Sequence, residues 1–516
     1  MPLPVLSPTQ SAAWDQKAVA AGIELATLME SAGRSVAAVL GDRYQASLLD
    51  GVLVAAGPGH NGGDGWVLAR ALHRLDVPVW VTAPAGTGAE LTERMARLAR
   101  AEGVREVAPD GPWPDAGLVV DALLGTGASG PPRAPLAQLL DRLADLEVPI
   151  VAVDGPTGID LASGIVHGAA RADLTVTFGG LRRGHLLARD EVGTVIVTDI
   201  GHPPGDPAWP STVTDDDAAG WLRRLTARDH KGSRGRVVVV GGDTGMTGAV
   251  RLASRAAFAA GAGLVHAVST PQTVEALVVA EPDLQTFPHP FDRAPSEELL
   301  TLLSKADAVV IGPGLGRAPG RRELVAALVG ATRTAVLDAD ALVAFQGEAE
   351  ELRSLAEGRA LVLTPHPGEF RMLFPELAAE RELDPWHAAE AAAEASGAIV
   401  LLKGVPTVVA RRRSPTFTVA AGNPGLATGG SGDVLSGIIG AVLAGGTAPD
   451  IAAALGAQIL GRAADIAARR TTARGLRPMD VVEAFPDLWR EWDQRQKRGL
   501  PPRPPILFEL PRPQTV

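Results

Sequence analysis

The stretch GNPGLATGGSGDVLSG, residues 422–437, decides the fold expected around it. Glycines surround a serine, and an aspartate and an apolar segment follow at once, which predicts a turn leading into a buried helix. Because glycine has no Cβ, the N–H groups of Gly429, Gly430 and Gly432 can point at one anion, and the helix dipole adds to the attraction. Asp433 would then lie beside a phosphate and could accept the proton of an attacking hydroxyl. The alternative is a plain turn with a capping Asp.

Length and charge limit the class of protein. With 516 residues the chain is too long for one ordinary core, and we expect two domains. Lys and Arg number 48 against 59 Asp and Glu, a net charge of -11 that disfavours binding to nucleic acid or acidic lipid. There is no cysteine, which excludes disulfides, cysteine zinc sites and thiol nucleophiles. Small molecules are therefore the expected partners.

Neither terminus nor interior predicts a membrane segment. The N-terminal residues lack a basic start followed by an apolar run, so we expect no signal peptide. The longest apolar run, residues 434–449, is shorter than a bilayer requires and rich in glycine, which favours a buried helix. We expect a cytoplasmic protein.

Short β-rich runs alternate with helical stretches, which predicts an α/β protein with mainly parallel sheets covered by helices. A segment rich in Pro and Gly, residues 201–212, separates two such series. We expect a Rossmann-like, doubly wound domain over residues 1–205, a second α/β domain over 215–490 and a proline-rich tail over 491–516. The expected strands are residues 51–56, 77–82, 117–121, 149–154, 174–178 and 194–198, and then 235–242, 263–268, 308–312, 334–338, 360–365 and 398–404.

Two glycine-dense loops follow strands of the first series, GPGHNGGDGWVLAR at 57–70 and VDALLGTGASGPP at 120–132. Each matches GxGxxG, a weak signal for a dinucleotide-binding oxidoreductase. The first copy lacks an acidic residue about 20 positions later, at the end of the next strand, and the second has Asp154 there, which leaves that interpretation open.

Oxygen-bearing side chains near these loops suggest a cation site. Asn61, Asp121 and Thr157 offer amide, carboxylate and hydroxyl oxygens, hard ligands that suit K⁺ better than a soft metal. The alternative is that Asp121 and Asp154 only cap loops.

The motifs GPGHNGGDG, VDALLGTG, VDGPTGID and TFGGLRRG together resemble those of NAD(P)H-hydrate epimerases over roughly residues 1–205. The resemblance implies that Asn61, Asp121 and Thr157 contribute to a K⁺ site. It also implies a pocket for hydrated NAD(P)H. Its expected lining is His60, Asn61, Gly62, Gly63, Asp64, Gly125, Thr126, Gly127, Ala128, Ser129, Gly130, Pro131 and Asp154.

This sequence departs from the epimerase pattern at three positions, with His60 in place of Asn, Thr157 in place of Ser and Arg182 in place of Lys. Thr157 keeps the hydroxyl, so we expect ion binding to be retained. His60 is bulkier than Asn and could be only a loop histidine. Arg182 keeps the positive charge but gives up a proton far less readily than Lys, which counts against acid–base work at this position.

In the second series, Lys403 and His366 are expected in one crevice, because the carboxyl ends of parallel strands meet at one edge of a sheet. Lys403 could contact nucleotide phosphates and His366 a substrate hydroxyl, although His366 could also be a loop histidine. The loops that follow these strands are IGPGLGR at 311–317, LDADAL at 337–342, LTPHPGEF at 363–370 and LLKGVPTVV at 401–409.

The second series closely resembles the ADP/ATP-dependent NAD(P)H-hydrate dehydratases, a branch of the ribokinase-like fold, over about residues 215–485. The resemblance rests on motifs in these loops together with HKGSRGRVVVVGG, GAGLV and the stretch 422–437. The resemblance implies that Ala249, Gly314, His366 and Asp433 contact the hydrated coenzyme, with Asp433 as catalytic base. The adenine nucleotide would be held by Lys403, Gly404, Val405, Pro406, Thr407 and Gly432.

An epimerase-like domain ahead of a dehydratase-like domain resembles the bifunctional nicotinamide nucleotide repair proteins of bacteria. The resemblance implies ADP-dependent dehydration of (S)-NAD(P)H hydrate to NAD(P)H, AMP and phosphate, with epimerisation of the R and S hydrates by the first domain. It implies ADP, or alternatively ATP, with Mg²⁺ and K⁺, NADH hydrate and NADPH hydrate as substrates, and a homo-oligomer. The rival is a ribokinase-like small-molecule kinase with a non-catalytic N-terminal nucleotide-binding module.

Overall fold

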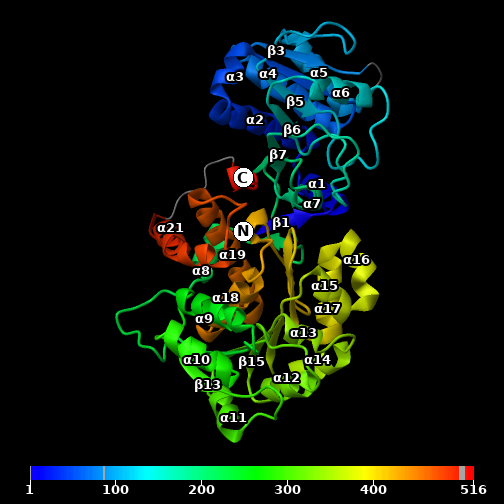
Figure 1. Cartoon of the computed structure of the whole chain (residues 1–516). Coiled ribbons are helices and arrows are strands. Elements are labelled where there is room, and N and C mark those ends of the chain that lie inside the picture. Colours follow the sequence, from blue (N-terminus) through cyan, green and yellow to red (C-terminus); the bar gives the residue numbers. More distant parts are fainter. Residues whose placement is uncertain (1, 85–87, 499–505, 516) are drawn as a thin grey trace. The chain divides into compact units, whose positions relative to one another are not determined.

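The computed structural model describes residues 2–84, 88–498 and 506–515. Its contacts divide the chain into a first unit, Met1–Trp209 with Pro501–Arg512, and a second unit, Pro210–Leu500 with Pro513–Val516. The division falls inside the Pro- and Gly-rich segment 201–212. Both units consist of helices around a mainly parallel sheet (Figure 1), so the expected α/β class is confirmed.

The sheet of the first unit has the strand order β20-β9-β7-β6-β5-β2-β3-β4. Every neighbouring pair is parallel except β20 with β9. Its strands are β2 (Val52–Ala56), β3 (Val79–Thr82), β4 (Arg105–Glu106), β5 (Leu118–Ala122), β6 (Ile150–Val153), β7 (Leu174–Phe178), β9 (Thr194–Thr198) and β20 (Ile506–Leu510). Strands β1 (Leu3–Leu6) and β8 (Leu181–Arg182) also pair with each other in parallel. The helices are α1 (Pro8–Ala20), α2 (Leu25–Arg43), α3 (Gln45–Asp50), α4 (His60–His73), α5 (Glu90–Ala101), α6 (Leu136–Ala144) and α7 (Arg183–Leu187).

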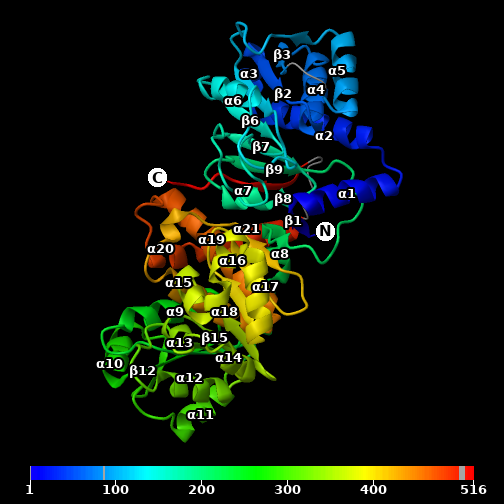
Figure 2. The ribbon, with the colours of Figure 1, turned by 90° about the vertical axis from the view of Figure 1, so that its right-hand side faces the viewer.

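Alternate residues of these strands face two helical layers, because successive side chains of a strand point to opposite faces. Val52 and Val54 of β2 belong to a core cluster with α2, α4 and α5. Leu53 and Ala55 belong to a second cluster with α6. Figure 2 shows α4 and α5 on one side of the sheet and α6 on the other. The first unit is therefore doubly wound, as the sequence predicts.

The sheet of the second unit runs β13-β12-β11-β14-β15-β16-β17-β18-β19-β10. It is parallel from β13 to β17, antiparallel from β17 to β19, and parallel again at β10. The strands are β10 (Ser211–Thr212), β11 (Arg236–Val240), β12 (Leu264–Ser269), β13 (Gln285–Pro288), β14 (Ala308–Ile311), β15 (Thr334–Leu337), β16 (Ala360–Leu363), β17 (Ile399–Leu402), β18 (Thr407–Ala410) and β19 (Phe417–Val419).

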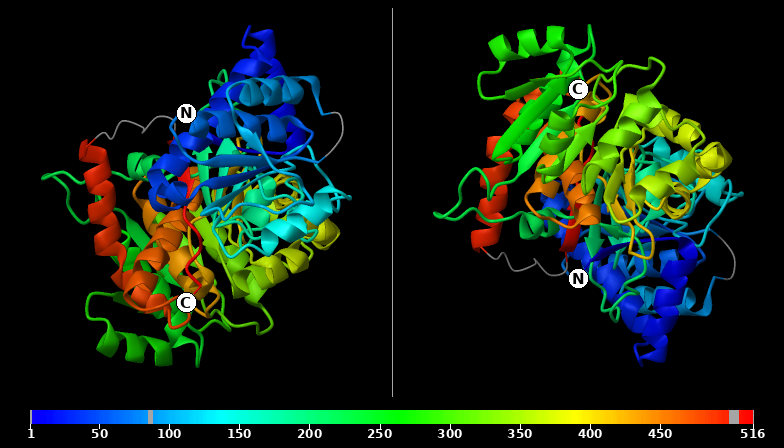
Figure 3. Two further views of the ribbon diagram at one scale, coloured as in Figure 1. Left: turned by 90° about the horizontal axis from the view of Figure 1, so that it is seen from above. Right: turned by 90° about the horizontal axis from the view of Figure 1, so that it is seen from below.

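Helices cover both faces of this sheet (Figure 3). Val237 and Val239 of β11 pack in one core cluster with α9, α18 and α19, while Val238 and Val240 are fully buried on the opposite face. The helices are α8 (Asp215–Trp221), α9 (Thr247–Ala259), α10 (Pro271–Ala280), α11 (Glu297–Ser304), α12 (Arg321–Gly330), α13 (Asp340–Val343), α14 (Ala349–Ala356), α15 (Pro367–Leu373), α16 (Ala378–Leu383), α17 (Pro385–Ser396), α18 (Ser431–Ala444), α19 (Pro449–Arg470), α20 (Pro478–Glu483) and α21 (Phe485–Arg498), with short 3-10 helices η1 (Pro375–Leu377) and η2 (Pro424–Leu426).

Among the described residues one helix, α19, is long and apolar enough to cross a membrane by length and composition. Within the fold, 83% of its apolar stretch is buried, because it packs in the core cluster beside α18. The apolar run at 434–449 lies mostly in α18, which is also buried.

The C-terminal region differs from a plain extended tail. Helix α21 continues past residue 490, because Trp492 is fully buried and Trp489 donates a hydrogen bond from Nε1 to Ala259 O at 3.2 Å. Strand β20 then pairs antiparallel with β9 at the edge of the first unit's sheet. Residues 499–505 and 516 of the expected tail lie outside the described residues.

Candidate active sites

The second unit brings the glycine turn together with Lys403 at the carboxyl ends of its strands. Lys403 follows β17, and Gly432 and Asp433 lie in the first turn of α18. A Cβ atom added to Gly432 would lie 3.4 Å from Lys403 Nζ and 3.5 Å from Asp338 Oδ2. Lys403 Nζ donates a hydrogen bond to Asp338 Oδ1 at 2.9 Å. These loops therefore form one site, as the strand order requires.

Glycine is needed where α18 begins. Gly430, the N-cap, has a left-handed φ of 99°, and a Cβ there would stand 2.7 Å from Leu252 Cδ1. The first N–H groups of a helix lack partners within the helix and carry its positive dipole end. The turn thus presents backbone donors next to the ammonium group of Lys403, which is suited to an anion.

The charge of Lys403 is stabilised by two carboxylates. Besides Asp338, Glu369 Oε2 lies 3.7 Å from Lys403 Nζ. Burial alone would lower the pKa of Lys403, but Asp338 and Glu369 outweigh burial and raise it. Lys403 therefore carries a positive charge.

Asp433 has an unusual acidity for a carboxyl group. Burial, followed by the negative charge of Asp338, raises its pKa to about 7, while Lys403 opposes the shift and Asp340 adds to it. A carboxyl with a pKa near neutrality can both accept and release a proton at physiological pH, which suits a general base.

His366 lies at the N-terminus of α15 beside this cluster. The imidazole Nδ1 of His366 accepts hydrogen bonds from the backbone N–H groups of Gly368 at 2.9 Å and Glu369 at 3.4 Å. The backbone N–H of His366 donates to Glu369 Oε2 at 2.8 Å. The His366 side chain is 55% exposed. Because Nδ1 is occupied as an acceptor, Nε2 is the ring nitrogen left to meet a ligand, and it lies 3.5 Å from Glu369 Oε1.

The expected coenzyme-binding residues Gly314 and Ala249 lie side by side. Gly314 has a φ of 62°, and a Cβ there would lie 3.1 Å from the Cβ of Ala249 and 2.8 Å from that of Met246. The loop after β14 therefore packs directly on the start of α9. Of the other expected nucleotide-binding residues, Gly404, Val405 and Pro406 lie in the turn between β17 and β18, and Thr407 is the first residue of β18.

Four polar residues of this site lie within the strand-end motifs without a role expected from the sequence: Asp338, Asp340, Thr364 and Glu369. Thr364 Oγ1 donates to Asp338 Oδ1 at 2.8 Å, and Asp340 accepts from the N–H of Gly316 at 2.9 Å. The signal that could have identified them is their position directly after the strands β15 and β16, inside motifs already recognised there.

In the first unit, Asn61 and Asp154 converge with the loop after β5. Residues 60–64 lie in the first turn of α4 and so are helical. A Cβ on Gly125 would lie 3.0 Å from Asp154 Oδ2 and 3.1 Å from Asn61 Oδ1. Among the described residues, neither polar side-chain atom of buried Asn61 has a hydrogen-bond partner. An unpaired buried amide points to a ligand at this position.

Asp154 is held by several donors at a constrained backbone position with a φ of 64°. The N–H and Oγ1 of Thr126 both donate to Oδ2, and Thr177 Oγ1 donates to Oδ1 at 3.0 Å. Arg182 Nη2 lies 3.3 Å from Oδ1. Burial favours a higher pKa for Asp154, but Arg182 and Thr126 outweigh it and lower the pKa, so Asp154 is a carboxylate.

Asp121 and Thr157 form a buried hydrogen-bonded pair beside the loop after β5. Thr157 donates to Asp121 from its N–H and from Oγ1, both at 2.7 Å, and Leu123 N–H adds a bond at 3.1 Å. Burial nevertheless raises the pKa of Asp121. Thr157 Oγ1 also accepts the N–H of Leu124 at 3.0 Å, so this pair lies against the loop after β5. Carboxyl and hydroxyl oxygens are hard donors of the kind that suits K⁺.

The remaining expected residues of the first site border these groups. Burial and the nearby charge of Asp154 raise the pKa of Asp64 well above its ordinary value. His60, Gly127, Ser129 and Pro131 are exposed, while the other loop residues, Ala128 and Gly130, are half-buried, as are Thr126 and Gly125. Gly62 and Gly63 are buried in α4.

No cluster of three or more His, Cys, Asp or Glu side chains suited to a metal ion occurs in the described parts of the chain. Divalent cations such as Mg²⁺ are commonly bound through nucleotide phosphate oxygens.

Two family models match the chain. The model described as NAD(P)H-hydrate dehydratase matches residues 237–487, and the model described as YjeF-related protein N-terminus matches residues 25–184.

Curated relatives match over most of the chain. The bifunctional NAD(P)H-hydrate repair enzyme Nnr of Escherichia coli (strain K12) is 36% identical over 444 residues, covering 84% of this chain and 84% of the relative. The protein of the same name from Coxiella burnetii (strain RSA 493 / Nine Mile phase I) is 36% identical over 490 residues, covering 92% and 96%. Among solved structures, ADP/ATP-dependent NAD(P)H-hydrate dehydratase from Bacillus subtilis, co-crystallised with ATP and Mg²⁺, is 26% identical with a TM-score of 0.47, covering 54% of this chain and 97% of that one.

Proposed function

The chain belongs to the family of bifunctional NAD(P)H-hydrate repair enzymes, and from this premise we propose that its second unit dehydrates (S)-NAD(P)H hydrate with ADP as phosphate donor. The first unit interconverts the R and S hydrates, so that both epimers reach the dehydratase. The observation that supports the dehydratase most directly is Asp433, a carboxyl with a pKa of about 7 in the turn that lies against Lys403.

The dehydration follows from the chemistry of these groups. Asp433 accepts the proton of the hydroxyl on the reduced pyridine ring, and that oxygen attacks the terminal phosphorus of ADP, whose bridging P–O bond breaks to release AMP. The ring nitrogen then expels phosphate as the C–O bond breaks, and loss of a proton from the neighbouring carbon restores the dihydropyridine. Lys403 and the N–H groups at the start of α18 hold the phosphates throughout. Mg²⁺ bound to those phosphates would neutralise part of their charge.

In the first unit, two neighbouring carboxyl groups have pKa values shifted in opposite directions. Burial and the nearby charge of Asp154 raise the pKa of Asp64, whereas Arg182 and Thr126 outweigh burial at Asp154 and lower its pKa. Such a pair separates the roles of acid and anion. We propose that Asp64 gives a proton to the ring hydroxyl, which then leaves as water. Asp154 stabilises the ring cation that remains, until water adds back on either face of the ring.

We also propose K⁺ as the ion held by Asn61, Asp121 and Thr157, where it would supply the positive charge that the buried carboxyl of Asp121 lacks. Because the substrates are damaged coenzymes, the protein is expected to act in the cytoplasm. A homo-oligomer is the expected state in solution, which light scattering would test.

The test uses a mixture of hydrate epimers with the full-length protein, ADP and Mg²⁺, followed by HPLC. The wild type should form NAD(P)H, AMP and phosphate from both epimers, and Asp433→Asn should slow dehydration by roughly 100- to 10,000-fold while epimer exchange continues. Accumulation of a stable phosphate ester would instead identify a small-molecule kinase. If Asp64→Asn exchanges the epimers no faster than the reaction without protein, the role of Asp64 as the acid is supported. If Asp64→Asn exchanges them as fast as the wild type, that role is refuted.

A further inference from the structure

The turn between β15 and α13, residues 338–340, presents two carboxylates that the proposed reaction does not use. Its central residue, Ala339, has φ 50° and ψ -121°, a left-handed conformation that is uncommon for a residue with a Cβ. Backbone strain of this kind persists only where the surrounding contacts hold it, and it is concentrated at functional sites. The contacts of Asp338 and Asp340 are therefore informative.

Asp338 faces the nucleotide side of the site. Asp338 is only 1% exposed. Its carboxylate accepts hydrogen bonds from Lys403 Nζ at 2.9 Å and from Thr364 Oγ1 at 2.8 Å. The ammonium group of Lys403 is thereby held at one place beside Gly432. A lysine side chain has many rotamers, so a fixed partner lowers the entropy lost when a phosphate binds.

Asp340 faces the coenzyme side. Its Oδ2 accepts the N–H of Gly316 at 2.9 Å, and its Oδ1 accepts Arg317 Nε at 2.8 Å. Both donors belong to the loop that contains Gly314, which packs against Ala249. Asp340 therefore fixes the loop expected to contact the hydrated coenzyme.

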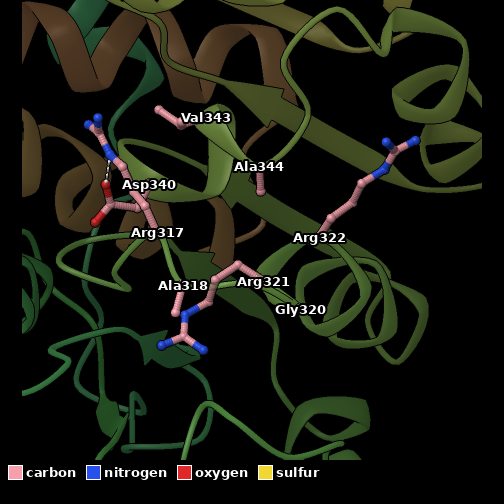
Figure 4. Close-up of a pocket in the computed structure, with 8 residues that line it drawn as sticks. All are labelled: Arg317, Ala318, Gly320, Arg321, Arg322, Asp340, Val343 and Ala344. Atoms are coloured by element: carbon pink, nitrogen blue, oxygen red, sulfur yellow. Dashed lines mark hydrogen bonds and ion pairs between the residues drawn. The ribbon is translucent and has the colours of Figure 1, made fainter.

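Figure 4 shows the Arg317–Asp340 pair at the wall of a pocket of about 210 Å³. The guanidinium groups of Arg321 and Arg322 point away from this pair and bind Asp243 and Glu351. In this view Arg317 is the arginine that Asp340 orients.

We propose that the turn Asp338–Ala339–Asp340 is a positioning element of the dehydratase, in which Asp338 orients Lys403 toward the nucleotide and Asp340 holds the Gly314–Arg317 loop toward the coenzyme. This inference rests on the proposed dehydratase function. Because both carboxylates come from one strained turn, the two substrates are aligned on a common support next to Asp433. A misplacement of about 1 Å between reacting groups can cost 100-fold in rate.

The same turn adjusts the base. The charged groups facing Asp433 are Asp338 and Asp340 from this turn and Lys403 from the end of β17, and Glu369 of α15 stands behind Lys403. Removing either negative charge of the turn should make Asp433 more acidic.

The test compares Asp338→Asn with Asp340→Asn, because Asn keeps the size and one acceptor but removes the charge. Asp338→Asn should raise KM for ADP by about 10-fold with KM for the hydrate within about 2-fold, and Asp340→Asn should do the reverse. In both variants the acidic limb of the pH profile of kcat/KM should move to lower pH. The control is Asp307→Asn, at the amino ends of the strands, where Asp307 Oδ2 accepts the N–H of Arg236 at 2.8 Å. That variant should leave both constants and the pH profile unchanged.

Equal changes of both KM values in the two variants, or no change in either, would overturn the inference. Arg317→Gln offers a second test if Asp340→Asn does not fold, because the Arg317 side chain is 66% exposed. It should raise KM for the hydrate and leave KM for ADP unchanged; unchanged KM for both would count against the role of Asp340.

Calorimetric titration with ADP, which needs no turnover, separates this inference from the proposed function. A wild type that binds ADP without forming NAD(P)H refutes the function, whereas the role of Asp338 is refuted if Asp338→Asn binds ADP as tightly as the wild type.

Discussion

Gly432 and Lys403 lie so close that a Cβ atom on Gly432 would stand 3.4 Å from Lys403 Nζ, an ordinary van der Waals distance. Gly432→Ala should therefore fold normally, and alanine is favoured over glycine within a helix by up to about 1 kcal/mol. The added methyl group would nevertheless occupy the space next to Lys403 that a phosphate needs. We expect KM for ADP to rise by about 10-fold with no loss of thermal stability.

Gly437→Ala is the matched comparison on the same helix. A Cβ there would lie 2.1 Å from the carbonyl oxygen of Ala253, so this variant should lose about 1–3 kcal/mol of stability. Steady-state kinetics and thermal unfolding of both variants separate the two effects. A Gly432→Ala protein that unfolds as early as Gly437→Ala would show that the glycine serves packing rather than the nucleotide.

Dehydration should depend on pH through Asp433. With a pKa of about 7, the base is increasingly protonated below neutrality, and kcat/KM should fall about tenfold per pH unit there. Lys403 lowers this pKa, so Lys403→Met should move the acidic limb to higher pH, besides weakening nucleotide binding. A limb that stays in place in Lys403→Met would contradict the assignment of that limb to Asp433.

The raised pKa of Asp433 also predicts a cost in stability. The folded state binds the proton of the Asp433 carboxyl more tightly than the unfolded chain does. The protonated carboxyl therefore adds to the stability of the fold fully below about pH 4, and this contribution is lost as pH rises through about 7. Asp433→Asn should therefore be more stable than the wild type at pH 8, by about 1–4 kcal/mol. Denaturant unfolding at pH 8 and pH 5 would measure this, and the difference should be smaller at pH 5.

The buried strands and the strand-end loops could be predicted from the sequence because their apolar runs and glycine turns are local signals. Residues 51–56 and 308–312, for example, correspond to β2 and β14. Strands β8 and β10, of two residues each, have no such run, and β20 forms only by pairing with a strand some 300 positions earlier. Local sequence does not contain that pairing.

For the candidate sites, the motifs identified the loops but not the network within them. The contact of Lys403 with Asp338 and Glu369 depends on which strands are neighbours, β15, β16 and β17, and that order is a property of the whole sheet. The strained φ of Ala339 likewise has no sequence signal, since alanine favours helices. The expected roles of individual site residues stay predictions for the experiments described here.

Arg182 should stabilise the first unit through Asp154. The pair is buried, with side chains 5% and 11% exposed, so Arg182→Met would leave an uncompensated carboxylate. We expect a loss of about 3–5 kcal/mol at pH 7. Because the pKa of Asp154 is lowered in the fold, the pair stabilises above the unfolded pKa near 4, and its contribution is lost as pH falls through the folded value.

Urea unfolding of Arg182→Met and Arg182→Lys would measure this contribution. Arg182→Lys keeps the charge and should lose less than the Met variant at pH 7, and the gap between the two should narrow at pH 4. An equal loss for Lys and Met would mean that hydrogen bonds of the guanidinium to Gly180 O and Thr126, rather than its charge, hold the site.

Potassium should stabilise the first unit if Asn61 is one of its ligands. Replacing KCl by choline chloride at equal ionic strength should lower the unfolding temperature of the wild type, since a ligand that binds the folded state stabilises it. Asn61→Ala should lose this response, whereas His60→Asn, at an exposed neighbouring position, should keep it. An Asn61→Ala protein that still responds to K⁺ would place the ion elsewhere.

Strand β20 should protect the edge of the first unit's sheet. It pairs with β9 from Ile506 to Leu510, and buried Arg189 donates to the carbonyl oxygens of Leu510 and Pro511. Deleting residues 506–516 would expose the unpaired groups of β9, so its amide hydrogens should exchange faster while those of β11 in the second unit keep their protection.

Arg43→Gln is the control, because its ion pair with Glu509 is partly exposed and contributes only about 0.2–1 kcal/mol. It should leave β9 protected. Unchanged exchange of β9 after the deletion would show that the strand adds nothing to the stability of the sheet, and self-association of the truncated protein would show that a second copy can take its place.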